Sequence, residues 1–203
     1  MRRNGFTLIE VLTASALLAV ATGIIWQTWL TANESAEVIE QKAAAAAEAG
    51  RALSVIAHEL RGASLGSVSL LPAAQIEYRV AEDLEGNGLA VDKTGALELG
   101  AARTIGRDAE DRNADGLRER QLVLVAGGTI QVLANDLLTN EDANGNGVLD
   151  SGEDANSNGR LERGVWFESS GQGVRMIIET TGKTRRGHVT PVSFQQLVRP
   201  RNP

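Results

Sequence analysis

Residues 6–30 read FTLIEVLTASALLAVATGIIWQTWL, and they decide the fold because their only ionisable side chain is Glu10. The stretch is longer than the roughly 20 residues that a helix needs to cross a hydrocarbon core of about 30 Å. Arg2 and Arg3 precede it, and this positive charge predicts a cytoplasmic N-terminus. Trp26 and Trp29 stand where an aromatic belt would mark the far interface. The sequence therefore predicts one membrane-spanning helix, with the bulk of the chain outside the cytoplasm.

A cleaved secretory signal is the alternative interpretation of this stretch. Such a signal has a short apolar region that ends at a small-residue cleavage site. Ala19 and Ala21 would provide that site, but the apolar run continues to Trp29. The length of the run therefore favours a membrane span.

The composition narrows the remaining function classes. The chain has 203 residues, 26 acidic against 20 basic side chains, no cysteine and two histidines. The acidic balance argues against a general nucleic-acid-binding face, and the absence of cysteine excludes disulfides and thiolate metal sites. A basic cluster of Lys183, Arg185 and Arg186 is interpreted as a charged hairpin end instead of a DNA contact. Any metal must be held by oxygen.

The first twelve residues, MRRNGFTLIEVL, resemble the class III signal of type IV pilins and type II secretion pseudopilins. The resemblance implies that a prepilin peptidase cleaves between Gly5 and Phe6 and that the new amino group is methylated. It also makes Glu10 similar to the family's assembly residue. Other pilin or pseudopilin subunits, the prepilin peptidase/methyltransferase and the membrane are the implied partners. The implied location is the inner membrane, with a periplasmic C-terminal domain that joins a filament after assembly.

The position of Glu10 has a physical consequence of its own. A carboxylate within a membrane span costs about 2.5–3.5 kcal/mol on insertion scales. No basic side chain lies between Arg3 and Lys42, so after cleavage the nearest cation would be the amino group of Phe6, on the same or a neighbouring subunit. Pairing between subunits would neutralise both charges and set the register of a filament. The alternative is that Glu10 lies shallow enough to reach the headgroups.

Residues 31–62 predict an amphipathic continuation of the helix, ending near Gly62. An apolar seam recurs at spacings of four and three: Ala32, Ala36, Ile39, Ala43, Ala46, Gly50, Leu53, Ala57 and Leu60. Its small residues favour packing against a sheet or neighbouring helices, and a coiled-coil dimer is the alternative. Residues 51–64 are similar to the end of the long helix in J-type minor pseudopilins and W-type minor pilins. His58 and Glu59 do not form a zincin motif, because position 62 is Gly62 and not histidine.

Residues 63–203 predict an extracytoplasmic domain rich in β-strands. Apolar and polar residues alternate at 76–80, and the stretches 121–125, 129–133, 174–180 and 189–194 also predict strands. The expected fold class is α+β: a long N-terminal helix packed on a mostly antiparallel β domain with calcium-loop insertions, as in pilins. This domain has only four aromatic residues and no cysteine, which is little for a stable core. The long polar loops therefore need another interaction to order them.

One of those loops matches the twelve-residue calcium pattern D-x-[DN]-x-[DN]-G-x5-E at every specified position. Alternating oxygen donors converge on one cation only if the chain turns sharply, which Gly147 permits. The predicted calcium ligands are Asp142, Asn144, Asn146, the carbonyl of Val148, Asp150 and Glu153. The alternative is that Asn-Gly pairs simply form turns between strands.

Incomplete copies of the pattern surround this loop. The next copy has Asp154, Asn156, Asn158 and Glu162, but Val165 takes the twelfth position. An earlier copy has Asp111, Asn113, Asp115 and Glu119, with Leu122 at the twelfth position and Asp108 or Glu110 as possible substitutes. Residues 83–88 are a faint fourth copy. Structural Ca²⁺ is therefore predicted in loops 108–122 and 142–165, with the 10⁻⁴–10⁻³ M affinities of extracellular modules.

No catalytic motif stands out, so the sequence predicts a protein that is not an enzyme and has no small-molecule substrate. The expected function is that of a minor subunit of a type II secretion pseudopilus or type IV pilus, at or near the tip, with calcium-stabilised loops. Glu10 argues against the K-type pseudopilin, which lacks this acid in the family. The alternative is a monomeric membrane-anchored calcium-binding surface module or an anchored enzyme. The choice between pilus and pseudopilus, the partner subunits and the place in the filament stay open.

Overall fold

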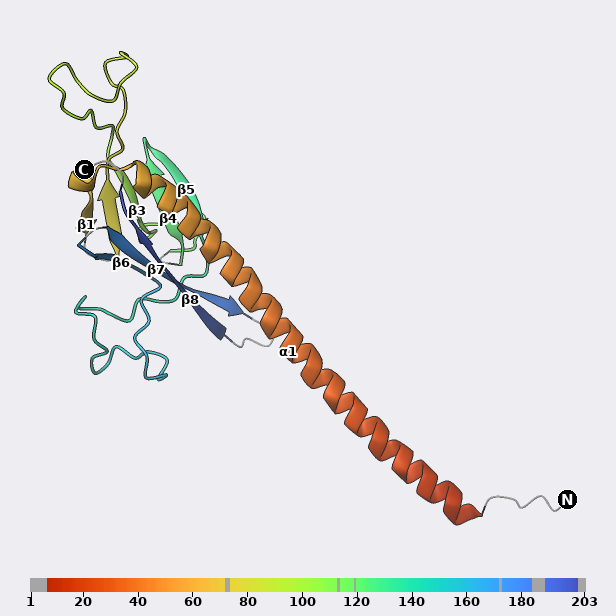
Figure 1. Ribbon diagram of the computed structural model, residues 1–203. Helices are drawn as coiled ribbons and strands as arrows, with labels where there is room; N and C mark the ends of the chain where they lie inside the picture. Colours follow the sequence, from red (N-terminus) through yellow and green to blue (C-terminus); the bar gives the residue numbers. More distant parts are fainter. Residues whose placement is uncertain are drawn as a thin grey trace. The chain divides into compact units, whose positions relative to one another are not determined.

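The computed structural model describes residues 7–71, 74–112, 114–118, 120–171, 173–183 and 189–200. The chain divides into two compact units, Met1–Glu40 and Gln41–Pro203. Helix α1, Leu8–Gly62, runs through the division, and it is drawn red to yellow in Figure 1.

The described part of the first unit is Thr7 and the N-terminal part of α1, most of whose apolar side chains are exposed. Five of its hydroxyl groups are nevertheless satisfied within the helix, because each donates to a carbonyl oxygen one turn earlier at 2.7–3.1 Å: Ser15, Thr22, Thr28, Thr31 and Ser35. Such internal pairing is what a helix needs in lipid, where no water is present to bind polar groups. Among the described residues, α1 is the one helix long and apolar enough to span a membrane.

The second unit contains two antiparallel sheets (Figure 1). The five-stranded sheet has the order β1 (Ser69–Leu71), β2 (Gln75–Tyr78), β3 (Arg103–Arg107), β4 (Leu122–Ala126) and β5 (Thr129–Ala134). The three-stranded sheet has the order β6 (Val165–Ser169), β7 (Val174–Lys183) and β8 (Val189–Val198), and a short 3-10 helix, Leu65–Ser67, follows α1. The predicted α+β class is confirmed. All five predicted strands are present, whereas β1, β3 and β6 were not predicted.

The core lies between the C-terminal part of α1 and the two sheets. The buried face of the helix consists of Ala45, Ala49, Ala52, Leu53, Ile56, Ala57 and Leu60. All of these residues except Ala45 form one cluster with side chains from both sheets, among them Ile76, Ile105, Val165, Met176 and Ile178. Burial of this face accounts for the packing of the helix on the β domain, since apolar burial is the main favourable term in folding.

The predicted apolar seam is correct only near the end of the helix. Leu53, Ala57 and Leu60 are buried, but Ala43 and Gly50 are exposed. The prediction used a spacing of 3.5 residues per turn, whereas a straight helix has 3.6, so the predicted stripe drifts by about 20° per heptad. His58 is exposed.

The buried Tyr78 makes the stability of the β domain depend on pH in alkaline solution. It is fully buried, and its hydroxyl donates to Glu59 Oε2 at 3.0 Å; Arg103 Nη1 lies 2.9 Å from the same oxygen. Burial, and then the negative charge of Glu59, raise the pKa of Tyr78 well above its ordinary value. Because the folded-state pKa is the higher one, the stabilisation is complete below the unfolded pKa of about 10 and is lost as pH rises above it.

We therefore expect the stability of the protein to fall above about pH 10, and Tyr78→Phe to flatten this part of the profile. Tyr78 is the only tyrosine, so phenolate absorbance reports it alone. Ionisation near pH 10 while the protein remains folded, as judged by circular dichroism, would contradict the predicted shift.

Candidate functional site

Glu10 caps the N-terminus of α1. Its Oε2 accepts hydrogen bonds from the backbone N–H and from the hydroxyl of Thr7, both at 2.9 Å. The backbone N–H of Glu10 in turn donates to Thr7 Oγ1 at 3.4 Å. Thr7 before the first helical residue and Glu10 three residues later form a capping box. The T-x-x-E spacing of this box is visible in the sequence, although the capping box was not predicted.

The cap leaves the charge of Glu10 without a described counterion. The neighbouring Leu8, Ile9 and Val11 are 79%, 68% and 53% exposed, so the carboxylate stands in an apolar surface. No Lys or Arg occurs from residue 7 to residue 41. The predicted processing and pairing residues, Gly5 and Phe6, lie outside the described residues, so cleavage and pairing remain predictions.

The four Asp/Asn-rich loops of the second unit share one backbone conformation. The sixth residue of each is a glycine with φ between +71° and +83°: Gly88, Gly116, Gly147 and Gly159. The fourth residue also has a positive φ of +57° to +72° in every loop: Gly86, Ala114, Gly145 and Ser157. Side chains with a Cβ rarely adopt this conformation. The sequence copies therefore fold as structural copies, including the one at 83–88 that looked faint.

The loops also share their internal hydrogen bonds. In each loop the first aspartate accepts the backbone N–H of the sixth residue, at 2.7–3.2 Å: Asp83, Asp111, Asp142 and Asp154. In each loop Oδ1 of the fifth residue accepts the N–H of the seventh, at 2.7–2.9 Å: Asn87, Asp115, Asn146 and Asn158. The oxygen-bearing side chains are thus folded over the loop interior.

The 142–153 loop brings the predicted ligands together. Glu153 Oε1 accepts the N–H of Ala143 at 3.0 Å, and its Oε2 accepts the N–H of Asp150 at 3.0 Å. Asp150 Oδ2 accepts the side-chain amides of Asn144 and Asn146 at 2.8 and 2.7 Å, and these two bonds lower the pKa of Asp150. The two amides would have to turn for their oxygens to face a cation.

Asp142 is the clearest sign that this loop suits a cation. Its side chain is fully buried, and Oδ1 has no hydrogen-bond partner. Its Oδ2 accepts the N–H of Gly147, and Arg163 Nε lies 3.5 Å away. A buried charged oxygen without a partner is costly, and an oxygen-seeking cation would satisfy it. Among the described residues, however, no three Asp, Glu or His side chains are gathered as a preformed metal cluster.

The other predicted ligands are described in part. In the 154–165 loop, the side-chain amides of Asn156 and Asn158 donate to Glu162 at 3.1 and 2.9 Å. In the 111–122 loop, Asp111 and Asp115 take part in the shared hydrogen bonds. Asn113 and Glu119 lie outside the described residues. The carbonyl of Val148 has no contact that tests its predicted role, although its N–H takes part in the loop.

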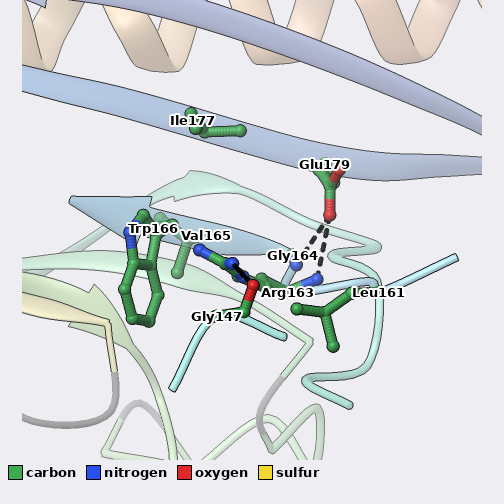
Figure 2. A pocket seen from close by; sticks show the side chains of 8 residues that line it. All are labelled: Gly147, Leu161, Arg163, Gly164, Val165, Trp166, Ile177 and Glu179. Carbon is green, nitrogen blue, oxygen red and sulfur yellow. Dashed lines mark hydrogen bonds between the residues drawn. The ribbon is translucent and has the colours of Figure 1, made fainter. Parts of the chain in front are cut away.

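Arg163 links the 142–153 loop to the three-stranded sheet, a role that the sequence analysis missed. Its guanidinium lies 4.4 Å from the centre of the Trp166 ring and donates to the carbonyl of Gly147 at 3.0 Å. The buried Glu179 of β7 accepts the N–H of Arg163 at 2.9 Å. These residues line a cavity of about 200 Å³ (Figure 2). No local pattern marks the link, because it joins residues far apart in sequence.

The comparisons with known proteins concern the N-terminus. Residues 1–26 match the family described as "Prokaryotic N-terminal methylation motif". No curated protein and no solved structure matches the chain. The matched segment includes Gly5, Phe6 and Glu10 and continues into the apolar part of α1. This motif, ahead of a long helix and antiparallel sheets, supports the assignment of the chain to the type IV pilin and pseudopilin family.

Proposed function

We propose that the protein is a minor subunit of a type II secretion pseudopilus or type IV pilus, located at or near the filament tip. The observation that carries the proposal is the N-terminal methylation motif with Glu10 on the exposed apolar surface of α1. The protein acts by assembly and not by catalysis. It is processed by the prepilin peptidase and assembles with other pilin or pseudopilin subunits.

The chemistry of α1 supports assembly through this helix. The hydroxyl groups bind the helix's own carbonyls, and the apolar side chains remain free to contact lipid or other helices. The charge of Glu10 is the exception. A free amino group of Phe6 on a neighbouring subunit would neutralise it, and the cost of an unpaired charge in lipid favours the paired, assembled state.

The finer parts of the proposal rest on the sequence. The minor-subunit assignment follows the similarity of residues 51–64 to J-type minor pseudopilins and W-type minor pilins. Arg2 and Arg3 support a cytoplasmic N-terminus in the inner membrane, and with this orientation the β domain would lie in the periplasm. Labelling with an antibody to the β domain tests the location: we expect label at filament ends. Label spread over cells that lack filaments would favour the anchored monomer.

Calcium is proposed to hold the 142–153 loop. Asp142, Asn144, Asn146, the Val148 carbonyl, Asp150 and Glu153 would supply the oxygen ligands, and the unpartnered Oδ1 of the buried Asp142 supports this assignment. The role is structural, because a cation that binds only the folded state stabilises it by mass action. Arg163 would transmit the order of the loop to Trp166 and β6.

We expect chelation by EDTA to lower the melting temperature of the full chain in detergent. Calcium at 100 times its Kd stabilises a protein by about 2.7 kcal/mol, which is about 5–10 °C for a chain of this size. Asp142→Asn should reduce the calcium-dependent shift, because it removes the buried charge of this loop. Glu168→Gln, on β6 outside the loops, should retain it. Equal melting temperatures of the wild type in calcium and in EDTA would contradict a structural cation.

A further inference from the structure

Three of the four loops lack an acid at the twelfth position, and the structure shows which side chain takes its place. In the complete loop, Glu153 Oε1 accepts the N–H of the second residue, Ala143, at 3.0 Å and that of the third, Asn144, at 3.4 Å. The N–H of the second residue therefore marks where the twelfth-position carboxylate lies relative to the rest of the loop.

In the 154–165 loop, Glu141 takes the position of the twelfth-position carboxylate. The N–H of the second residue, Ala155, donates to Glu141 Oε1 at 3.1 Å, and the other carboxylate oxygen accepts the N–H of Glu162 at 3.2 Å. Val165, at the twelfth position, is the buried first residue of β6 and has no oxygen in its side chain. Glu141 immediately precedes the neighbouring 142–153 loop in the sequence. Its contact with Ala155 therefore joins residues that are 14 positions apart.

In the two other incomplete loops, too, a carboxylate from outside the loop takes the position of the missing twelfth-position acid. Glu98 accepts the N–H groups of the second and third residues of the 83–88 loop, Leu84 and Glu85. Asp108 accepts the N–H of Arg112, the second residue of the 111–122 loop, with both oxygens, at 2.9 and 3.0 Å. Glu98, Asp108 and Glu141 are 8%, 1% and 6% exposed. A buried carboxylate from outside the twelve residues therefore closes each incomplete loop.

The buried negative charges around Glu141 favour a bound cation, because hydrogen bonds alone would leave these charges without a counterion. Glu141, Asp142 and Glu162 are 6%, 3% and 5% exposed. Within the described residues, neither Glu141 nor Glu162 forms an ion pair with a basic side chain, and Asp142 has Arg163 at 3.5 Å. Buried carboxylates without a counterion are strongly destabilising. One feature of each loop points to a ligand. In the 142–153 loop it is the unpartnered Oδ1 of the buried Asp142, and beside the 154–165 loop it is a cavity of about 750 Å³ lined by Glu141, Glu162 and the two loop asparagines.

We propose that residues 141–165 bind a pair of divalent cations, and that Glu141 is the closing ligand of the second. Asp142 and Glu153 hold the first cation, whereas Asp154, Glu162 and Glu141 hold the second, with Asn156 and Asn158 as neutral donors. The inference rests on the calcium site of the proposed function. It adds a ligand that the spacing of the motif does not contain.

The test counts calcium per chain in the full-length protein in detergent, by equilibrium dialysis against radioactive calcium. Glu141→Gln, Asp154→Asn and Glu153→Gln should each lose one calcium relative to wild type, and the control Glu168→Gln should lose none. Glu141→Gln with Asp154→Asn should still lose only one, because both remove the same ion. Glu141→Gln with Glu153→Gln should lose two. If Glu141→Gln does not fold, Glu141→Asp, which keeps the charge but withdraws the carboxylate, should weaken one site at least about tenfold.

The failures of the two proposals differ. Wild-type calcium content in Glu141→Gln and wild-type affinity in Glu141→Asp would overturn the role of Glu141 and leave the first site standing. A loss of only one ion in the Glu141→Gln, Glu153→Gln double variant would place both acids in one site, and this too would overturn the pair. Wild-type protein without bound calcium would overturn the calcium proposal itself, while the filament assignment would be unaffected.

Discussion

The Glu10→Gln variant should reach the membrane at the wild-type level but enter filaments at least about tenfold less, a deficit of about 1.4 kcal/mol or more. Glutamine serves in a capping box as glutamate does, so the bonds to Thr7 are kept. What is lost is the charge, and with it the attraction to a neighbour's Phe6 amino group. The cost of about 2.5–3.5 kcal/mol for a charge in the bilayer shows that such a pair can supply this difference. The measurement is the ratio of the protein in sheared filaments to that in membranes.

Two further variants separate the roles of Glu10. Glu10→Ala removes the cap as well as the charge, and it should assemble no better than Glu10→Gln. Glu40→Gln changes an exposed glutamate near the end of the first unit and should assemble normally. If Glu10→Gln entered filaments at the wild-type ratio while Glu10→Ala did not, Glu10 would be only a helix cap and the pairing account would be wrong.

Gly164→Ala should destabilise the β domain by about 2–5 kcal/mol. Gly164 precedes β6 with φ +66°, and a Cβ there would overlap the carbonyl oxygen of Leu138 and the guanidinium of Arg107. The backbone cannot easily move away, because the carbonyl of Gly164 accepts the N–H of Glu179 at 2.6 Å. The left-handed conformation costs about 1–2 kcal/mol and the overlap about 1–3 kcal/mol. Thermal melting of the full chain measures the sum.

Gly128→Ala is the matched control for this prediction. Gly128 lies in the turn between β4 and β5 with φ +82°, and a Cβ there would meet nothing within 4 Å. It should therefore cost only the conformational part, about 1–2 kcal/mol. Equal destabilisation by the two variants would contradict the crowding described around Gly164.

The parts of this fold that the sequence predicts are those with local patterns. The apolar run around Glu10 predicts α1, and the Asp142 loop carries its spacing within twelve residues. The capping box of Thr7 and Glu10 is equally local and could have been predicted. By contrast, β3 contains Arg103 and Arg107 around a short apolar centre and has little alternation to mark it.

The parts that could not be predicted depend on contacts between distant residues. Glu98 meets an N–H 14 residues earlier in the chain, and Glu141 meets one 14 residues later. Asp108 was predicted as a possible substitute because it lies only three residues before its loop. Arg163 acquires its role only when the fold brings Gly147 and Glu179, each 16 residues away in the chain, into contact with it. Spacing within a motif cannot reveal ligands that tertiary structure supplies from outside that motif.

The intact mass of the protein purified from filaments tests the central claim, that this chain is a processed filament subunit, most directly. The account predicts a chain that begins at Phe6, lacks the five residues Met1 to Gly5 and carries one added methyl group. A filament-free membrane protein of full-length mass would contradict it and would favour the anchored monomer.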